Sequence, residues 1–242
     1  RQKYHPMKSL APRDVTARAI YTEMTRRGED FVYLDVRHKD PEQTRRHFPN
    51  IYEKCLSLGI DITRDLIPVT PAAHYCCGGV KVDLNGETSI RRLYALGETS
   101  CTGLHGANRL ASNSLIEAVV YADQAAKHAA SQLASVEIQE GIPDWDFEGT
   151  QHTEEMLMII QSKREMQAIM SNYVGIVRSN LSLERALRRL SIIYEETEEL
   201  HNKIKPNREL CELRNMIAVA YLVIKQGSAS VSYTHLRAHE TP

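Results

Sequence analysis

Apolar residues recur at helical spacing near the start of the chain, on a face formed by Val15, Ala19, Ile20 and Met24. This spacing is typical of an amphipathic helix with one side against a core. Asp14 precedes the face and Gly28 follows it, and both residue types are common at helix ends. The pattern predicts a helix over residues 14–27 with Asp14 near its N-cap.

Shorter elements are predicted next. An apolar run indicates a strand over residues 31–36. Residues 41–58 indicate one or two short helices, interrupted near Pro49 because proline cannot continue a helix. Residues 59–67 read as a connector.

Two further segments are marked by turn residues. Asn85-Gly86 is typical of a tight turn between antiparallel strands, so we predict a hairpin of residues 79–84 with residues 87–90. Residues 135–149 have few apolar positions and contain Gly, Pro and acidic residues, which indicates a linker.

The rest of the chain is predicted to be helical, over residues 150–170, 174–199 and 208–225. We expect these helices to form a bundle whose core includes Met156, Leu157, Ile160, Met166, Leu181, Leu183, Leu187 and Leu190. The helical pattern stops at Gly227. Residues 227–242 are therefore predicted to be a non-native tail from adapter or cloning read-through, with a natural disordered tail as the alternative.

Composition limits the class of protein. The chain has 242 residues, of which 42% are hydrophobic and 25% charged, so it can bury one large or two small cores. A net charge of −1 argues against a nucleic-acid or membrane-surface partner. No apolar run approaches the roughly 18 to 20 residues that a membrane span needs.

The cysteines are expected to be reduced thiols, which fits a cytoplasmic protein. Their number is odd, and no spacing among them suits zinc, so we expect no metal site. Adjacent Cys76-Cys77 could be redox-active, but two small buried thiols are the preferred interpretation. The five are Cys55, Cys76, Cys77, Cys101 and Cys211.

The most informative segment is Gly103-Leu-His-Gly-Ala-Asn-Arg-Leu-Ala-Ser-Asn-Ser-Leu-Ile-Glu117. Small, polar and cationic residues stand there just before a helix predicted to begin near residues 112–114 and to end near Leu133. The positive end of a helix favours anionic groups. Upstream, residues 93–98 predict a buried strand that ends at Gly97 and places the Glu98 carboxylate at the same edge, where it could accept hydrogen bonds from a ribose. The alternative is a plain strand, loop and helix.

This segment, together with Pro71-Ala-Ala-His-Tyr-Cys-Cys-Gly-Gly79 and Leu10-Ala-Pro-Arg-Asp-Val15, resembles the L-aspartate oxidases. These are flavoproteins of the succinate dehydrogenase and fumarate reductase superfamily. The resemblance is colinear from about Tyr4 to Gln226. Other members of the superfamily usually have Gly-Gly where this chain has Ala111-Ser112, the version typical of aspartate oxidases.

The resemblance implies an α/β plus all-α fold. Its expected parts are the rear of a capping domain (residues 1–74), the C-terminal part of a Rossmann-like FAD-binding domain (residues 75–134), the linker (residues 135–149) and a three-helix bundle (residues 150–226). The chain has no initiator Met and no Gly-x-Gly-x-x-Gly for a pyrophosphate near its start. We therefore expect it to be the C-terminal part of a longer protein.

The resemblance also implies a reaction, the FAD-dependent oxidation of L-aspartate to iminoaspartate. Oxygen or fumarate would be the oxidant. This is the first step of de novo NAD biosynthesis through quinolinate, so quinolinate synthase would use the product. The alternatives are a fumarate reductase or succinate dehydrogenase flavoprotein subunit, and a non-catalytic helical interaction module.

Specific residues carry over from the family by position. Arg13, His74 and Arg109 are the candidate catalytic residues. Guanidinium groups bind carboxylates through paired hydrogen bonds, so Arg109 is expected to bind substrate together with His74 and His105. Arg13 would be either the proton-transfer group or an electrostatic anchor. The expected FAD ligands are Glu98 at the ribose and Asn113, Ser114 and Leu115 at the flavin.

Overall fold

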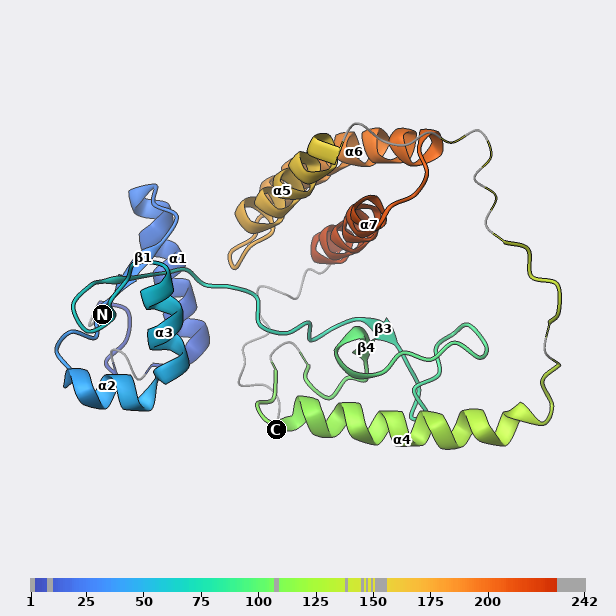
Figure 1. The fold of residues 1–242 in the computed structure, drawn as a ribbon, viewed down its shortest axis with the longest axis horizontal. Helices are drawn as coiled ribbons and strands as arrows, with labels where there is room; N and C mark the ends of the chain where they lie inside the picture. Colours follow the sequence, from blue (N-terminus) through green and yellow to red (C-terminus); the bar gives the residue numbers. More distant parts are fainter. Residues whose placement is uncertain are drawn as a thin grey trace. The chain divides into compact units, whose positions relative to one another are not determined.

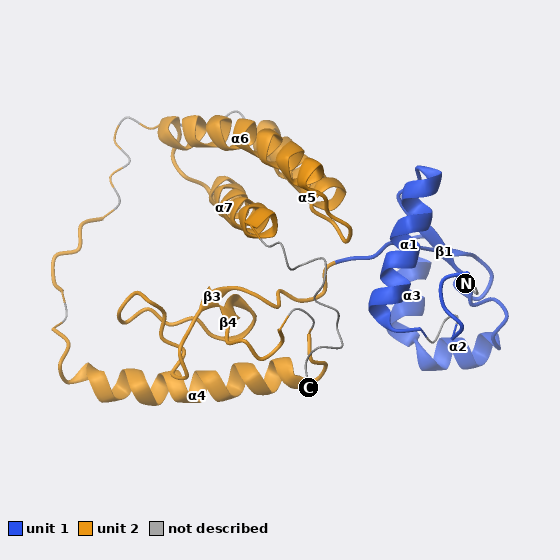
Figure 2. Ribbon diagram, turned by 180° about the vertical axis from the view of Figure 1, so that it is seen from behind, with its two compact units in different colours: residues 1–72 blue, residues 73–242 orange. Residues whose placement is uncertain are grey.

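The computed structural model describes residues 3–7, 11–106, 109–137, 139–144, 146, 148, 150 and 156–229. It separates into two compact units, residues 1–72 and residues 73–242 (Figure 2). Leu10, Ala107 and Asn108 of the motifs and parts of the predicted linker lie outside the described residues.

The first unit begins with helix α1 (Arg13–Arg27), as predicted (Figure 1). Gly28 ends the helix in the left-handed conformation, with φ at 70°, and its N–H donates to Met24 O at 2.9 Å. Asp14 lies inside the first turn, because Pro12 takes the N-cap position. There its charge favours the positive helix end without capping it.

Two proline-led helices follow, α2 (Pro41–His47) and α3 (Pro49–Ser57). Asp40 caps α2, since its Oδ1 accepts the Gln43 N–H at 2.7 Å. Each proline stands at the first helical position, where a missing N–H costs nothing. The predicted interruption at Pro49 is therefore confirmed.

A short antiparallel ladder completes this unit. Strand β1 (Val32–Leu34) pairs with β2 (Ile67–Val69). The predicted strand is thus present but shorter than residues 31–36, and the predicted connector ends where β2 begins.

In the second unit, the predicted hairpin of residues 79–84 with residues 87–90 is wrong. Strand β3 (Val80–Lys81) pairs in parallel with β4 (Ser100–Cys101), not with residues 87–90. The Asn-Gly turn does form, and the Gly86 N–H donates to Asp83 O at 3.1 Å. The strand predicted over residues 93–98 is also wrong. It is reduced to a bridge between Tyr94 and Glu87, followed by the 3₁₀ helix η2 (Gly97–Thr99).

Close backbone approach explains why a glycine stands before β3. Gly79 has φ at +146°, and a Cβ there would lie 2.2 Å from the Thr99 carbonyl oxygen. Gly97, with φ at +68°, turns the chain into η2. The parallel pair therefore depends on backbone geometry that the hydrophobic pattern does not encode.

Helix α4 (Asn113–Leu133) begins within the predicted residues 112–114. Ser112 precedes it in the left-handed conformation, with φ at 69°. The first turns of α4 carry large exposed apolar side chains, namely Leu115, Ile116, Val119 and Val120. This face has no cover among the described residues.

Three helices pack around one core, α5 (Met156–Tyr173), α6 (Asn180–Lys203) and α7 (Arg208–Ala229). Met166, Leu183 and Leu190 are buried as predicted, and Leu187 packs against the core. Leu157, Ile160 and Leu181 were expected there but are 73%, 38% and 55% exposed. Ile159 takes the inward position instead, and the most deeply buried residues include Leu210 and Ile224 of α7.

Polar contacts support the bundle at its edges. Ser179 and Ser182 form a reciprocal capping box at the start of α6. Arg214 of α7 binds both carboxylate oxygens of Glu198 of α6, and its side-chain hydrogen bonds lower the pKa of Glu198. This pair stabilises the α6–α7 contact above the ordinary carboxyl pKa, and its contribution is lost as the pH falls through the lowered pKa.

The last helix extends into the segment predicted to be a tail. Helix α7 runs through Gly227 to Ala229, so the helical pattern does not stop at Gly227. Residues 230–242 lie outside the described residues.

We predict that Gly79→Ala lowers the free energy of unfolding by about 1–3 kcal/mol, because the strained φ and the clash with Thr99 act together. Gly78→Ala is the matched control, since a Cβ there meets nothing within 4 Å, and its effect should stay below about 1 kcal/mol. Urea unfolding followed by circular dichroism measures both. Equal effects would contradict this account.

Candidate active site

Arg109 and His74 come together although 35 positions separate them in the chain. The Arg109 guanidinium donates from Nη1 to His74 Nε2 at 3.1 Å and from Nε to Ser114 Oγ at 2.7 Å. His74 is exposed, while Ser114 is buried in the first turn of α4. We call Arg109 and His74 the carboxylate clamp. Both groups can donate hydrogen bonds to an anion at the same place.

The ring of Tyr75 packs against the Arg109 guanidinium. The guanidinium carbon of Arg109 lies 5.1 Å from the Tyr75 ring centroid, within the range of a cation–π contact. The Tyr75 ring meets the edge of His105 with centroids 5.1 Å apart. Tyr75 thus links the clamp to the residues beneath it. Its position directly after His74 was the only sequence signal for this role.

His105 lies in a buried polar cluster. It is 5% exposed, and its Nε2 lies 2.9 Å from Oε2 of Glu117, which is 6% exposed. The Leu110 N–H donates to His105 Nδ1 at 3.2 Å, so both ring nitrogens already have protein partners. His105 has no ring nitrogen free for substrate in this arrangement. Glu117 was not among the predicted site residues, although a carboxylate on a helix of apolar residues was a usable signal.

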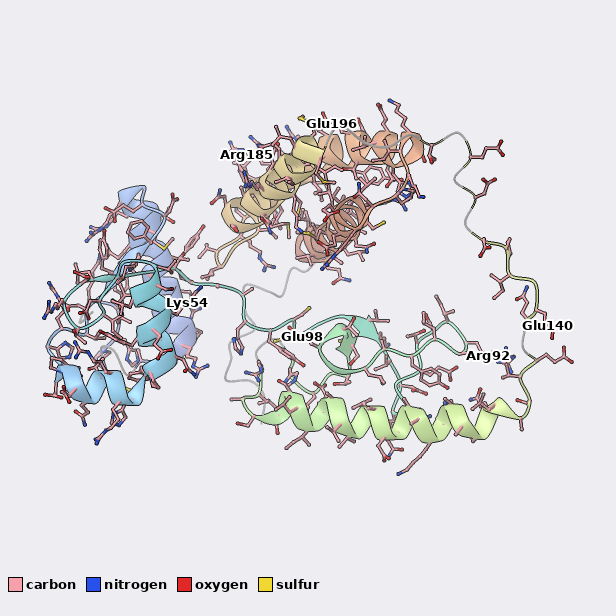
Figure 3. All side chains as sticks on the ribbon, viewed as in Figure 1. Lys54, Arg92, Glu98, Glu140, Arg185 and Glu196 are labelled. Carbon is pink, nitrogen blue, oxygen red and sulfur yellow. The ribbon has the colours of Figure 1, made fainter. Side chains whose placement is uncertain are left out.

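Glu98 lies in η2, in the segment before α4 (Figure 3). Its Oε1 accepts the Cys76 N–H at 2.9 Å, which fixes the carboxylate. The side chain is exposed, and among the described residues Oε2 has no hydrogen-bond partner. Glu98 therefore keeps one oxygen available for a ribose hydroxyl.

The start of α4 supplies hydrogen-bond donors. Ser112 makes no side-chain cap, and Asn113, Ser114 and Leu115 are the first three helical residues, whose N–H groups have no acceptor within the helix. Within the described chain no side chain accepts from the Ser114 or Leu115 N–H. Two free amides beside a positive helix end match the anionic pyrimidine edge of a reduced flavin. These donors and the Glu98 carboxylate fit FAD.

Arg13 is the first residue of α1 and belongs to the other unit. Its side chain is exposed and makes no hydrogen bond or ion pair with the described residues. It is thus free to bind an anion, and its catalytic role stays a prediction.

The two neighbouring cysteines are free thiols. Burial raises the pKa of the Cys77 thiol, with a further contribution from Cys76, so Cys77 is a poor nucleophile at neutral pH. Across the described residues, no group of three or more His, Cys, Asp or Glu side chains is placed to hold a metal ion. None of the helices in this part of the chain has both the length and the apolar composition needed to cross a bilayer.

Two family models match the chain. The model for an FAD binding domain matches residues 3–115, and the model for the C-terminal part of the fumarate reductase flavoprotein matches residues 163–229. The first match confirms the expected cofactor. The second covers most of the three-helix bundle.

Curated relatives are named L-aspartate oxidase. The chain is 48% identical to that of Pseudomonas aeruginosa over 223 residues, covering 92% of this chain and 41% of the relative. It is 47% identical to that of Yersinia pestis over 222 residues, covering 92% and 42%. A chloroplastic L-aspartate oxidase of Oryza sativa is 44% identical over 248 residues, covering 93% and 37%. The chain thus spans about two fifths of the length of the curated relatives it matches.

Solved structures show the same fold. A quinol-fumarate reductase with menaquinol molecules matches with a TM-score of 0.74 and 29% identity, covering 91% of this chain and 42% of that one. Mycobacterium smegmatis Sdh1 in complex with UQ1 matches with a TM-score of 0.71 and 28% identity, covering 91% and 40%.

We predict that Glu98→Ala in the purified flavoprotein weakens FAD binding by about 10- to 100-fold, which is the loss of one charge-assisted hydrogen bond of 1.5–3 kcal/mol. Glu140→Ala is the matched control, because Glu140 is an exposed carboxylate that makes no hydrogen bond or ion pair within the described residues (Figure 3). Fluorescence titration with FAD measures both. Unchanged affinity in Glu98→Ala would remove Glu98 from the ribose site.

Proposed function

Because the chain belongs to the flavoprotein superfamily of succinate dehydrogenases and fumarate reductases, we propose that it is the C-terminal part of an L-aspartate oxidase. One observation carries the proposal. The clamp of Arg109 and His74 stands at the start of α4 in a chain that is 42–49% identical to enzymes of that name. The reaction is the oxidation of L-aspartate to iminoaspartate.

The clamp binds a substrate carboxylate. Arg109 has neutral partners, His74 and Ser114, so its charge is not cancelled before substrate arrives. The Nε contact to Ser114 orients the guanidinium plane, and one Nη1 hydrogen is donated to His74. The remaining Nη1 and Nη2 hydrogens are left for a carboxylate. His74 donates to the same or the second carboxylate. A dicarboxylate amino acid is thereby held in one orientation.

The chemistry that FAD supplies when bound is acceptance of the hydride from the substrate Cα. Glu98 would hold the ribose of FAD, and the N–H groups of Ser114 and Leu115 would hold the flavin, with Asn113 supporting the helix start. These amides would stabilise negative charge on the bound cofactor, as oxyanion-hole donors do. Arg13, from the proposed capping domain, either takes the substrate proton or acts as an electrostatic anchor for the substrate.

We propose the domain assignment that the family resemblance implies. Residues 1–74 are the rear of the capping domain, residues 75–134 part of a Rossmann-like FAD-binding domain, and residues 150–226 the helical bundle. The uncovered apolar face of α4 supports the second assignment, because such a face is buried in a complete α/β layer.

The proposed role is the first step of de novo NAD biosynthesis. Oxygen or fumarate re-oxidises the enzyme, and quinolinate synthase consumes the product. We place the protein in the cytoplasm, although the Oryza sativa relative is named chloroplastic.

A fumarate reductase or succinate dehydrogenase subunit is the second candidate, because the solved structures that match carry these names. Two observations weigh against it. Those structures are 29% and 28% identical, well below the named oxidases. The loop also has Ala111-Ser112, where the resemblance leads us to expect Gly-Gly in that branch.

Anaerobic mixing of the full-length flavoprotein with L-aspartate or succinate tests the proposal. L-Aspartate is expected to bleach the flavin absorbance, and succinate is not. Bleaching by succinate alone would assign the chain to the dehydrogenase branch. Bleaching by neither substrate, with FAD bound, would favour a non-catalytic interaction module.

We predict that Arg109→Met raises the KM for L-aspartate by about 100-fold, since a bidentate charge-assisted contact is lost. Arg109→Lys keeps the charge but not the paired hydrogen bonds, so its KM should lie between those of wild type and Arg109→Met. Arg91→Met is the control, because Arg91 is exposed and makes no hydrogen bond or ion pair in the described part of the chain. Steady-state kinetics with FAD content measured in parallel would contradict the clamp if KM stayed unchanged.

A further inference from the structure

We propose that Glu117 is a positioning residue for the carboxylate clamp. It acts through His105 and the described residues of the loop before α4 (102–106 and 109–110), and it touches neither substrate nor cofactor. This inference rests on the proposed function, because the clamp is the group being positioned.

Glu117 fastens the loop at two points. It lies in the second turn of α4 and is 6% exposed. One carboxylate oxygen accepts the hydroxyl of Thr102, where the loop begins. The other lies 2.9 Å from Nε2 of His105, in the middle of the loop. A single buried carboxylate therefore ties two parts of the loop to the helix.

The contacts of His105 with Leu110 and with Glu117 together fix the tautomer of its ring. The Leu110 N–H donates to Nδ1 at 3.2 Å, so Nδ1 is an acceptor and carries no proton. Nε2 then carries the ring proton and donates it to Glu117. If the proton moved to Nδ1, the Leu110 N–H would lose its acceptor and Glu117 would lose a donor. In a buried cluster no water replaces either bond.

His105 is connected to Arg109 indirectly, through the backbone of Leu110 and through the ring of Tyr75. Leu110 is the next residue in the chain, so its bond to His105 holds the backbone that carries Arg109. The His105 ring also packs against Tyr75, whose face lies 5.1 Å from the guanidinium carbon. The clamp is thus held by backbone and by ring, and both depend on the orientation of His105.

The same arrangement keeps the negative charge away from the clamp. Glu117 binds Thr102 and His105, while Arg109 binds only neutral groups among the described residues. A carboxylate paired directly with Arg109 would hold it in place but would compete with substrate. Because Glu117 acts on Arg109 only through His105, it can hold the loop rigid without competing with substrate for Arg109.

Kinetics of the full-length enzyme test the proposal with two variants. Glu117→Leu removes both acceptors and should raise the KM for L-aspartate by about 10-fold or more, the cost of one misplaced hydrogen-bonded clamp. Glu117→Gln keeps an acceptor for His105 and can donate to Thr102, so its KM should stay within about threefold of wild type. Flavin content and melting temperature are measured alongside.

A double-mutant comparison separates positioning from general damage. In the Arg109→Met background, Glu117→Leu should raise KM no further, because its effect passes through Arg109. An equal rise in both backgrounds, or equal KM values for wild type and Glu117→Leu, would overturn the proposal. If Glu117→Leu does not fold, Thr102→Val removes one of the two attachment points and takes its place in the comparison.

A substrate-free readout distinguishes this inference from the proposed function. Imidazole ¹⁵N NMR of wild type should show His105 protonated at Nε2 alone, and Glu117→Leu should shift it toward a mixture of tautomers. A proton on Nδ1 in wild type would overturn the inference even if aspartate is oxidised. The expected tautomer in a protein that aspartate fails to reduce would leave the arrangement of Glu117 standing and remove the oxidase assignment.

Discussion

The second unit is organised around an arginine whose charge has to stay available. Arg109 is half-buried at the start of α4, and its partners are an imidazole, a hydroxyl and an aromatic ring. No carboxylate among the described residues pairs with it. Such a group needs to be held rigidly by neutral contacts, because an ion pair would satisfy the charge that the ligand has to meet. The buried contacts beneath the loop supply that rigidity.

Backbone geometry brings the parts of the site to one edge. The parallel pair of β3 and β4 places the segment of His74 beside the segment of Glu98. This pairing requires Gly79, where the two backbones approach too closely for a Cβ. Donors from the helix start, a fixed carboxylate and the clamp are thereby gathered from three separate stretches of chain.

The relatives share this scaffold and differ in chemistry. Solved fumarate reductase and Sdh1 structures match the fold with TM-scores of 0.74 and 0.71. The named oxidases are closer in sequence, at 48% and 47% identity. Within a superfamily, function is assigned from the site and not from the fold. The residues at 111 and 112 are therefore more informative than the overall match.

Local signals in the sequence determined the helices, whereas the family resemblance named the residues of the clamp. The start of α4, the break at Pro49 and the left-handed end at Gly28 depend on neighbouring residues alone, so they were readable without a structure. Arg109 and His74 were carried over from the family by their positions in the matching segments.

The tertiary structure decided what long-range contacts control. Val80 pairs with Ser100 and not with residues 87–90 across the Asn-Gly turn. This pairing is possible because Gly79 lets its backbone approach Thr99 more closely than a Cβ would allow. Leu157 and Leu181 face outward although their apolar character fits a core, since helical period alone leaves the rotation of each helix open. The role proposed for Glu117 depends on its contacts with Thr102 and His105, which no local pattern specifies. The sequence therefore named Arg109 and His74, and only the tertiary structure showed which residues support them.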